Sequence, residues 1–426
     1  MSNVYVIDGA RTPFLKVRGE PGPFRASDLA VYAGRALLAR QPFLPNQLDQ
    51  VIIGCVGPGA DEANIGRLIA LRLGCGRTVP GWTVQRNCAS GMQALDAAAQ
   101  SIRLGQSHLI LAGGTEAMSH APLLFQTAFV KWLARLQKAP SLIAKTLQLL
   151  KFRPGFLIPE ISLMKALTDP VVNLSMGQTA EEIAYQFHIN RTQMDTLAAD
   201  SHLRVLAAQK AGYFDTEIVP LYGKDGAILQ DDGVRTDATL ERLAKLRPVF
   251  EKYGNITAGN SSQITDGAAL LILASEEAVT HHQLPVLGRI VDTHWSGVDP
   301  AVMGLGPVHA ISSVLQKNKL GLSDMGAIEI NEAFAAQVIG CVKAFADPNY
   351  CQKELQLPHA FGTCEQLNVD GGAIALGHPV GASGARLVLH LLSILARQKS
   401  RYGVASLCIG GGQGGALLVE NLKGAA

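Results

Sequence analysis

The sequence lacks closely spaced cysteines, dense basic clusters and long hydrophobic runs. Its seven cysteines form no C-x-x-C pair and no Cys/His ligand spacing, which argues against a disulfide framework or a structural zinc site and favours a reducing compartment. The formal net charge is only +2, and Lys and Arg are not clustered among aromatic residues, so we do not expect a nucleic-acid partner. No apolar run approaches the length of a membrane span.

A secretory signal is also missing. Residues 4–7 form an apolar stretch directly after the N-terminal methionine, with no charged leader and no cleavage site. We therefore expect a cytoplasmic protein, or one of the mitochondrial matrix if the source is eukaryotic.

Apolar segments alternate with helical patterns along most of the 426 residues, of which 48% are hydrophobic. Residues 4–7, 51–56 and 109–114 have the composition of buried strands, and turns are expected after the first and third, at 8–14 and 115–118. Strands that alternate with helices predict an α/β fold.

Two distant parts of the chain show the same order of elements. Residues 89–103 predict a helix that begins at Ala-Ser-Gly and is followed by a strand at 109–112 and two glycines. Residues 381–397 predict a helix that begins at Gly-Ala-Ser-Gly, followed by a strand at 404–407 and a glycine run at 410–415. We therefore expect two similar halves.

Strand signals thin out in the middle of the chain, where prolines divide short helical segments. We interpret residues 120–246 as an inserted loop domain. The N-terminal half then comprises residues 1–119 and 247–275, and the C-terminal half comprises residues 276–426.

The first part of this insertion, residues 124–165, has the pattern of a basic amphipathic helical hairpin, with a second short helix expected at 142–150. Such a hairpin can lie on an anionic membrane or cover a partner protein, or its apolar stripe can pack against the body of the protein. The stripe consists of Phe125, Phe129, Trp132 and Leu136, and the basic residues that can face away from it are Lys131, Arg135 and Lys138.

Cys88 lies at the start of a predicted helix, where Asn87 leads into Ala-Ser-Gly. The first backbone N–H groups of a helix lack partners and the helix dipole is positive there, so this placement favours the thiolate over the thiol. A lone cysteine is otherwise usually a small buried hydrophobic residue. We expect Cys88 to be a reactive nucleophile.

Two residues of the C-terminal half have the chemistry to assist Cys88. His378, within Gly-His-Pro, is suited to take a thiol proton near neutral pH, although taken alone it also fits a structural role in a tight turn. Cys408 precedes the glycine run 410–415 and is a candidate for acid and base catalysis at carbon. Glycines there let backbone N–H groups approach a ligand and form an oxyanion pocket.

Five segments together resemble the thiolases, the family of coenzyme A-dependent acetyl- and 3-ketoacyl-CoA acyltransferases. The resemblance runs nearly end to end. It implies a five-layered αβαβα core of two similar halves with mixed β-sheets, a loop domain over the active site, and a homodimer or homotetramer. The segments are residues 87–91, 113–119, 331–335, 368–379 and 408–414.

The resemblance implies that Cys88 carries the acyl group, that His378 activates it and that Cys408 shuttles the proton. In thiolysis, Cys88 would attack the 3-keto carbon of a 3-ketoacyl-CoA, acetyl-CoA would leave as its enolate, and free CoA would take the acyl group. The reverse reaction is a Claisen condensation of acetyl-CoA. One oxyanion site is implied at His378 with a water held by Asn331, and another at the N–H groups of Cys88 and Gly410.

Coenzyme A is implied as a co-substrate, and no metal is implied. By resemblance, Ser262 contacts the pantetheine arm and Ala258 belongs to the same CoA-binding stretch. Arg235 would lie near the adenine end, with a solvated surface charge as the alternative. Met176 and Phe334 would form walls of the acyl pocket.

Two features of the sequence indicate which branch of the family the chain resembles. The branch specific for acetoacetyl-CoA usually carries histidine where this chain has Ser175, which suggests a roomier acyl site. The extended loop at 151–160 resembles the β-subunit of the trifunctional fatty-acid oxidation complex, although that branch usually has histidine in place of Asn331. We expect a degradative 3-ketoacyl-CoA thiolase of β-oxidation, with an acetoacetyl-CoA-specific enzyme as the alternative. The trifunctional branch implies a hydratase/dehydrogenase partner and peripheral membrane contact through residues 124–165.

Three other classes of protein share single features with this sequence. A decarboxylating ketoacyl synthase shares the nucleophilic cysteine but normally uses two histidines, so Cys408 argues against it. A non-catalytic acyl-CoA or lipid-binding protein would not need Cys88, His378 and Cys408 intact. A redox or metal protein lacks suitable cysteine spacing.

Overall fold

The computed structural model describes residues 2–224 and 226–423. The strands of its large sheet are β1 (Val4–Arg11), β2 (Leu15–Lys16), β3 (Gln50–Gly54), β4 (Gly81–Val84), β5 (Leu109–Ala117), β10 (Thr265–Ser275), β11 (Gly288–Gly297), β12 (Met325–Ile330), β13 (Tyr402–Ile409) and β14 (Gln413–Glu420). They follow the order β12-β13-β14-β11-β1-β10-β5-β3-β4, with β2 paired to β10. The sheet has two halves, which in the described part of the chain are joined where Tyr5 and Val6 of β1 pair with Arg289 and Gly288 of β11.

The two halves repeat one topology. In the first half, β1 and β10 are antiparallel, β10 and β5 are antiparallel, and β5 and β3 are parallel. In the second half, the pairs β11–β14, β14–β13 and β13–β12 have the same three orientations. Helix α3 (Ser90–Arg103) leads into β5, and α15 (Val380–Gln398) leads into β13. The predicted duplication is confirmed.

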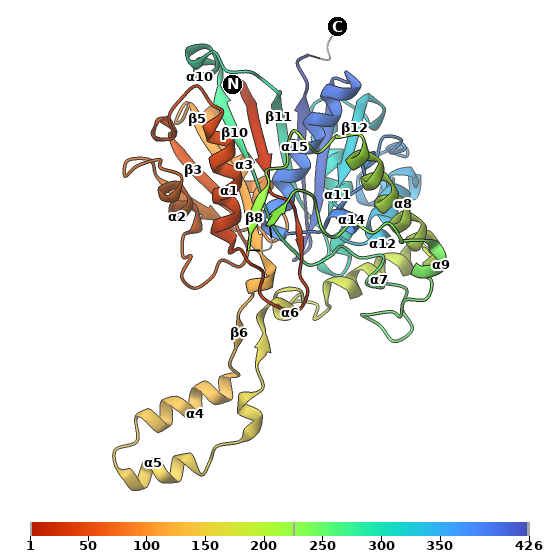
Figure 1. Cartoon of the computed structure of the whole chain (residues 1–426). Coiled ribbons are helices and arrows are strands. Elements are labelled where there is room, and N and C mark those ends of the chain that lie inside the picture. The colour runs from red at the N-terminus through yellow and green to blue at the C-terminus, as the bar shows by residue number, and fades with distance from the viewer. Residues whose placement is uncertain (1, 225, 424–426) are drawn as a thin grey trace.

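Helices cover both half-sheets and fill the space between them (Figure 1). Helices α1 (Ala26–Ala39) and α2 (Ile65–Arg72) pack on the outer face of the first half. Helices α3 and α15 lie together between the two halves and share a core with both of them. On the outer face of the second half lies α11 (Gly306–Lys317), which also contacts α12 (Ala335–Ala346). The layers are therefore α, β, α, β, α, as the sequence predicted.

Small residues allow the two central helices to pack closely. A Cβ atom added at Gly384 of α15 would lie 2.6 Å from the backbone nitrogen of Met92 in α3. Such a contact brings the first turns of both helices together, and these turns follow Cys88 and His378 in the sequence. The remaining helices of the core are α10 (Glu276–His282), α13 (Pro348–Glu354) and α14 (Ala373–Leu376).

The loop domain lies beside the C-terminal half and contributes to its core. The Ser175 hydroxyl accepts a hydrogen bond from the Gln178 N–H and caps α7, and the Asn190 side chain caps α8 in the same way. Val205 and Ala208 of α8 pack against Ala375 of α14, three residues before His378. The elements of the loop domain, apart from the hairpin, are α6 (Ser162–Ala166), α7 (Met176–Gln186), α8 (Arg191–Lys210), α9 (Leu240–Leu243), β8 (Leu221–Gly223) and β9 (Gly226–Ile228).

The hairpin projects away from the rest of the molecule (Figure 1). A short two-stranded stalk, β6 (Leu123–Leu124) and β7 (Glu160–Ile161), connects it to the body. Beyond the stalk are α4 (Thr127–Gln137), α5 (Leu142–Leu149) and a 3-10 turn at Pro154–Leu157.

The aromatic stripe of the hairpin packs inside the hairpin itself. The rings of Phe129 and Trp132 stack with centroids 5.7 Å apart, and Trp132 meets Phe152 edge-on at 5.2 Å. The Trp132 indole N–H donates to the Gln148 carbonyl at 2.9 Å. The expectation that this stripe covers the body of the protein is therefore wrong, because the second arm of the hairpin already occupies it.

Several strand limits differ from the expected ones. The turns expected at 8–14 and 115–118 are largely strand, since β1 continues through Arg11 and β5 continues through Ala117. Both extensions pair with β10, which supplies their backbone hydrogen bonds. A Cβ atom at Gly113 would lie 2.2 Å from the Ala269 carbonyl oxygen, so this glycine allows close strand approach rather than a turn. β14 likewise begins within the glycine run.

Helix α15 has the length and hydropathy of a membrane-spanning helix, and it is the only one among the described residues that does. In the fold, 78% of its apolar window is buried. Its hydrophobicity is that of the central core helix between the two half-sheets.

Candidate active site

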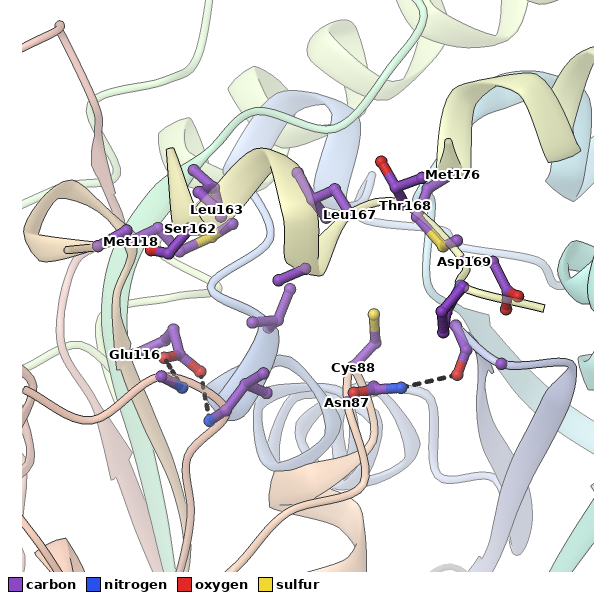
Figure 2. A pocket seen from close by; sticks show the side chains of 18 of the residues that line it. Asn87, Cys88, Glu116, Met118, Ser162, Leu163, Leu167, Thr168, Asp169 and Met176 are labelled. Carbon is purple, nitrogen blue, oxygen red and sulfur yellow. Dashed lines mark hydrogen bonds between the residues drawn. The ribbon is translucent and has the colours of Figure 1, made fainter. Parts of the chain in front are cut away.

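A cavity of about 500 Å³ lies where the loop domain meets both halves of the core. Cys88 and Asn87 form part of its floor, and Leu163 and Leu167 lie on the opposite side (Figure 2). The thiol of Cys88 points into the space between them. The lining residues are 56–58, 87–88, 116–118, 121–122, 162–163, 166–171, 176, 380 and 410–411.

The lining of this cavity is mostly apolar and has no basic group. Met118, Pro122, Leu163 and Leu167 are among its apolar residues. Of the described residues that line it, none is Lys, Arg or His, and its two acids are Glu116 and Asp169. Both carboxylates accept hydrogen bonds from backbone N–H groups. The cavity therefore suits an uncharged aliphatic chain.

Local backbone geometry presents the Cys88 thiol to the cavity. Asn87 adopts a left-handed conformation with φ of +44°, which asparagine tolerates better than most residues. Its amide Nδ2 donates to the Gly410 carbonyl at 2.7 Å. The Gly410 N–H in turn donates a hydrogen bond to the Cys88 sulfur. The two segments, 323 positions apart in sequence, are thus bound to each other on both sides of Gly410.

The prediction that the helix start holds Cys88 as a thiolate is wrong. Burial raises the pKa of Cys88 to about 11, although the Gly410 N–H opposes that shift. Cys88 precedes α3 by two residues, and the N–H groups of Ala89 and Ser90 donate to the carbonyls of Arg86 and Asn87. These donors are no longer free to stabilise a negative sulfur. At neutral pH the free protein carries Cys88 as a thiol, which needs a base.

His378 is buried directly before α15. Its Nδ1 lies 2.6 Å from the Ser383 hydroxyl, which donates to the Pro379 carbonyl at 3.1 Å. Ser383 must therefore accept the Nδ1 proton, so the lone pair is on Nε2. Burial, and secondarily the Arg386 charge, lower the pKa of His378 to about 3. The imidazole is neutral, and its basic nitrogen is Nε2.

Asn331 contacts that basic nitrogen. Its Nδ2 lies 3.3 Å from His378 Nε2, and its Oδ1 is buried without a hydrogen-bond partner in the described structure. A buried amide oxygen without a partner is costly unless a water or ligand satisfies it. Its chemistry therefore fits an ordered water near His378.

Cys408 lies in β13, next to the glycine turn. Burial raises its pKa well above the usual value, and the thiols of Cys88 and Cys341 raise it further. The sulfur of Cys88 is therefore near enough to influence Cys408 electrostatically. Three segments converge at the cavity: Cys88 itself, Val380 two residues after His378, and Gly410 two residues after Cys408.

The other predicted contacts divide into two groups. Met176, the first residue of α7, lines the cavity, and a Cβ atom at Gly410 would lie 3.2 Å from its sulfur. Phe334 packs edge-on against Phe250 and is outside the cavity lining, as are Ser262 and Ala258. The Ser262 N–H donates to the Ala333 carbonyl, so this stretch lies beside the Asn331 segment. Arg235 is half-exposed and forms an ion pair with Asp237.

Sequence reasoning missed three contributors to the site. Glu116 was seen only as part of a motif, and Ser383 only as part of a helix start. The five-residue spacing between Ser383 and His378 could have indicated a contact, because a hydroxyl in the first turn of a helix can reach back to the preceding loop. The cavity wall at Leu163 and Leu167 had no sequence signal, since it depends on how α6 folds over Cys88.

Two family models cover almost the whole chain. "Thiolase, N-terminal domain" matches residues 4–277, and "Thiolase, C-terminal domain" matches residues 284–421. The curated relatives include a beta-ketoadipyl-CoA thiolase of Acinetobacter baylyi, 39% identical over 99% of this chain and 100% of its own length. They also include the mitochondrial 3-ketoacyl-CoA thiolase of Homo sapiens, 38% identical over 99% of both chains.

Solved structures give the same result. Human mitochondrial 3-ketoacyl-CoA thiolase in complex with CoA aligns with a TM-score of 0.85 at 38% identity, covering 99% of this chain and 98% of that one. The acetyl-CoA acetyltransferase of Bacillus anthracis aligns with a TM-score of 0.84 at 36% identity, covering 99% of both.

Proposed function

Because the chain belongs to the thiolase family, we propose that Cys88 is the nucleophile of its acyltransferase reaction. The enzyme uses coenzyme A to cleave a 3-ketoacyl-CoA, and the reverse reaction is a Claisen condensation. The observation that carries the assignment of Cys88 is its thiol, which points into an apolar cavity and accepts a hydrogen bond from Gly410.

In the first half-reaction, Cys88 Sγ attacks the 3-keto carbon while its proton passes to Nε2 of His378. The neutral state of both groups supports this order, because a preformed thiolate–imidazolium pair is disfavoured by both pKa values. The bond between C2 and C3 then breaks. Acetyl-CoA leaves as its enolate, which takes a proton at C2 from the Cys408 thiol, and the shortened acyl group stays on Cys88.

In the second half-reaction, the Cys408 thiolate removes the proton from the thiol of an incoming CoA. That sulfur attacks the acyl-Cys88 thioester, and the Cys88 sulfur leaves and regains the proton held by His378. Acyl-CoA is released, and all three residues return to their starting state. Run backwards, the same steps make Cys408 the base that removes a proton from acetyl-CoA.

Two groups of donors suit the oxygens that become negative. The N–H groups of Cys88 and Gly410 face the sulfur, and the Asn331 amide lies beside His378. Removing one such donor typically costs about 3 to 4 kcal/mol of transition-state stabilisation. A loss of this size in a variant that removes the Gly410 N–H would support a role of the glycine turn in the chemistry.

We further propose that the acyl substrate is an uncharged aliphatic 3-ketoacyl-CoA. The relatives include thiolases named for a dicarboxylic substrate and for 3-ketoacyl-CoA. A cavity that presents Glu116 and Asp169 but no cation in its lining would bury the carboxylate of a dicarboxylic tail without a partner. An aliphatic tail has no such cost. Ser175, at the N-terminus of α7, is consistent with chains longer than acetoacetyl.

The test is a series of kcat/KM values for thiolysis, with acetoacetyl-CoA, 3-ketohexanoyl-CoA, 3-ketododecanoyl-CoA and 3-oxoadipyl-CoA as substrates. We expect the aliphatic substrates above four carbons to exceed 3-oxoadipyl-CoA at least about tenfold, because of the unpaired charge. Cys88→Ala should abolish turnover with all of them. A preference for 3-oxoadipyl-CoA would refute the substrate class, a preference for acetoacetyl-CoA would favour the acetoacetyl-specific alternative, and an active Cys88→Ala would refute the nucleophile.

We also propose that the hairpin docks on an anionic membrane surface. With its aromatic stripe used internally, it still exposes aliphatic side chains: Leu142, Ile143 and Leu150 are each at least 75% exposed. Residues 121–168 contain seven basic residues and a single acid, Glu160, which is paired with Lys165. Exposed aliphatic groups flanked by cations are the composition of an interfacial anchor.

Binding to vesicles tests this proposal. Replacing Lys131, Arg135, Lys138 and Lys145 with Gln should weaken binding to phosphatidylglycerol-containing vesicles roughly a hundredfold or more, at about 1 kcal/mol per cation. A matched control replaces the exposed residues Lys210, Lys252, Lys353 and Lys399, and should leave binding unchanged. Equal binding of both variants, or binding only to a hydratase/dehydrogenase subunit, would refute the membrane proposal.

The remaining expectations stay proposals. Strand β4 is one of the two terminal strands of the sheet, and among the described residues its outer edge pairs with no other strand, which supports pairing with a second copy in a homodimer or homotetramer. Light scattering measures the mass of the protein in solution and so distinguishes a monomer from a dimer or a tetramer.

The free cysteines support a reducing compartment, cytoplasmic or mitochondrial. We also retain the division into residues 1–119 with 247–275, the loop domain 120–246, and 276–426.

We propose that Ser262 and Ala258 contact coenzyme A from the stretch beside the Asn331 segment, and that Phe334 helps to shape that stretch. The Ser262–Ala333 backbone hydrogen bond supports this arrangement. The ion pair of Arg235 with Asp237 supports the alternative of a solvated charge for Arg235.

A further inference from the structure

Glu116 is a buried carboxylate in the wall of the cavity. It belongs to the end of β5, and its residue is only 3% exposed. The catalytic steps described above do not use it. Figure 2 shows its side chain on the same side of the cavity as Cys88, with hydrogen bonds that leave its carboxylate toward two other segments.

The carboxylate binds backbone N–H groups from two segments far apart in sequence. One oxygen accepts from the N–H of Val56 at 2.9 Å and from that of Gly381 at 3.0 Å. The other accepts from the N–H of Gly57 at 2.9 Å. Val56 and Gly57 follow β3, whereas Gly381 is the second residue of α15. Glu116 therefore joins three segments: β5, the loop after β3, and the first turn of α15.

That turn of α15 is packed directly against the segment of the nucleophile. A Cβ atom at Gly114 would lie 1.8 Å from the Gly381 carbonyl oxygen, and one at Gly91 would lie 2.6 Å from the same atom. Gly91 is three residues after Cys88, and Gly381 is three residues after His378. The carbonyl of Gly381 thus contacts the Cys88 helix and β5, while its N–H is bound by Glu116.

The N–H groups bound by Glu116, together with the Cys55 thiol at 3.7 Å from one oxygen, favour the ionised carboxylate, whereas burial raises the pKa of Glu116. Three N–H groups converge on two oxygens, which together offer about four acceptor positions. A glutamine amide would turn its NH₂ group toward at least one of these donors. The negative charge also suits the N-terminal turn of α15, whose N–H groups lack partners within the helix.

We propose that Glu116 is a positioning residue for the reaction, which fixes the first turn of α15 and thereby holds His378 in place relative to Cys88. Ser383, which orients the His378 ring, lies in the same turn. A shift of this turn moves the base and its orienting hydroxyl together. The proposal rests on the roles given above to Cys88 and His378.

The charge of Glu116 gives a readout that a purely structural role would not. Burial is the main cause of the raised pKa of Cys88, and the Glu116 carboxylate raises that pKa further. Removing the charge should therefore make the Cys88 thiol easier to ionise even while catalysis declines. A loosened scaffold would also expose the Cys88 thiol and speed its reaction, so the charge effect is isolated by comparing two variants that both disturb the turn, of which one keeps the charge.

The experiment compares Glu116→Gln, which keeps the size and loses the charge, with Glu116→Asp, which keeps the charge and loses the reach. Both should lower kcat for thiolysis at least about tenfold, because misplacement of a base by 1 Å can cost about a hundredfold, while KM for CoA changes less than about twofold. Iodoacetamide labelling of Cys88, followed by mass spectrometry of its peptide, should be faster at pH 8 in Glu116→Gln than in Glu116→Asp.

Glu62→Gln is the matched control. Glu62 is also a buried carboxylate, and it accepts a hydrogen bond from the Ser27 N–H at 2.9 Å outside the cavity lining. The Glu62→Gln variant should keep the wild-type kcat and the wild-type rate of Cys88 labelling. Thermal unfolding of every variant identifies those that fold, and Glu116→Asp, which retains the charge, carries the kcat test if Glu116→Gln does not fold.

Three results would overturn the inference. The first two are a folded Glu116 variant with kcat within twofold of wild type and a labelling rate of Glu116→Gln no faster than wild type. A loss of kcat in Glu62→Gln equal to that in the Glu116 variants would do the same. Activity of Cys88→Ala would instead refute the proposed function, so the two failures are distinguishable.

Discussion

In the proposed mechanism, Cys88 and His378 begin the reaction as neutral groups, because the same burial opposes charge on both. For the thiol, burial raises the pKa to about 11, and for the imidazole it lowers the pKa to about 3. The proton therefore moves only when the acyl carbon is attacked and the developing charge is on the substrate oxygen. Ser383 decides which ring nitrogen receives it.

At this scale we predict that Ser383→Ala lowers kcat about tenfold to a hundredfold, with little change in KM for CoA. Without the hydroxyl, Nδ1 no longer has a fixed acceptor, and the tautomer with its proton on Nε2 becomes accessible, which cannot act as the base. Steady-state thiolysis measures the effect.

Ser312→Ala is the matched control for this prediction. Ser312 is equally buried, and its hydroxyl has no partner in the described structure. An unchanged kcat in Ser383→Ala, or an equal loss in Ser312→Ala, would contradict the role of Ser383.

The sequence was sufficient to select candidate reactive residues, but not to describe their ionisation state. Cys88, His378 and Cys408 were identified from residue type and their glycine-rich surroundings, which are local properties. Ionisation of Cys88 depends on how completely the fold removes it from water and on where the Ala89 and Ser90 N–H groups point. Those are properties of tertiary packing, which residue order alone does not reveal.

At the scale of elements, glycine sets how closely the central layers approach. The predicted order of strands and helices was correct, since it follows from periodicity and from helix starts such as Ala-Ser-Gly. The extent of β5 was not, because two glycines at the end of an apolar run favour a turn directly after them, at 115–118, and the pairing of that segment with β10 is a long-range contact. The absent side chains of Gly113 and Gly114 make room for the Ala269 and Gly381 carbonyls.

We predict that Gly114→Ala destabilises the protein by about 3 kcal/mol or more. Overpacked core sites typically cost about 1–3 kcal/mol, and here the added methyl would meet the backbone oxygen of Gly381 rather than a flexible side chain. Urea unfolding measures the loss, and thiolysis by the folded fraction should fall as well.

The control is Gly297→Ala at the exposed end of β11, where an added Cβ meets nothing within 4 Å. It should change the free energy of unfolding by less than about 0.5 kcal/mol. Equal stability of the two variants would show that α15 can move away from β5 at little cost.

At the scale of the whole molecule, a buried ionic network connects the loop domain to the core. His390 of α15 binds Glu217 of the loop domain and Asp370 of the core, each at 3.0 Å. Glu217 is also bound by Arg11 at 2.6 Å. Burial alone would lower the pKa of His390, but the Glu217 charge and the two hydrogen bonds outweigh it and raise the pKa to about 9.

The network should make stability depend on pH in a defined window. The folded-state pKa of His390 exceeds its unfolded value of about 6.5, so its contribution is complete below pH 6.5 and is lost as the pH rises to about 9. We predict that wild type loses about 3 kcal/mol more than His390→Gln over this interval. Chemical unfolding at pH 6, 7.5 and 9 measures it.

His281→Gln, at an exposed histidine of α10, is the control and should follow wild type. Parallel curves for wild type and His390→Gln would mean that His390 is not charged in the folded protein.

The hairpin's aromatic interior and its paired stalk make it separable from the enzyme. Leu123 and Ile161 face each other across the stalk, so the chain leaves and returns at nearly one place. Replacing the segment between them with a two-residue bridge would leave an enzyme in which Asn87 and Cys88 still form the floor of the cavity. Attached at such a site on another protein, the excised segment would be a transferable module.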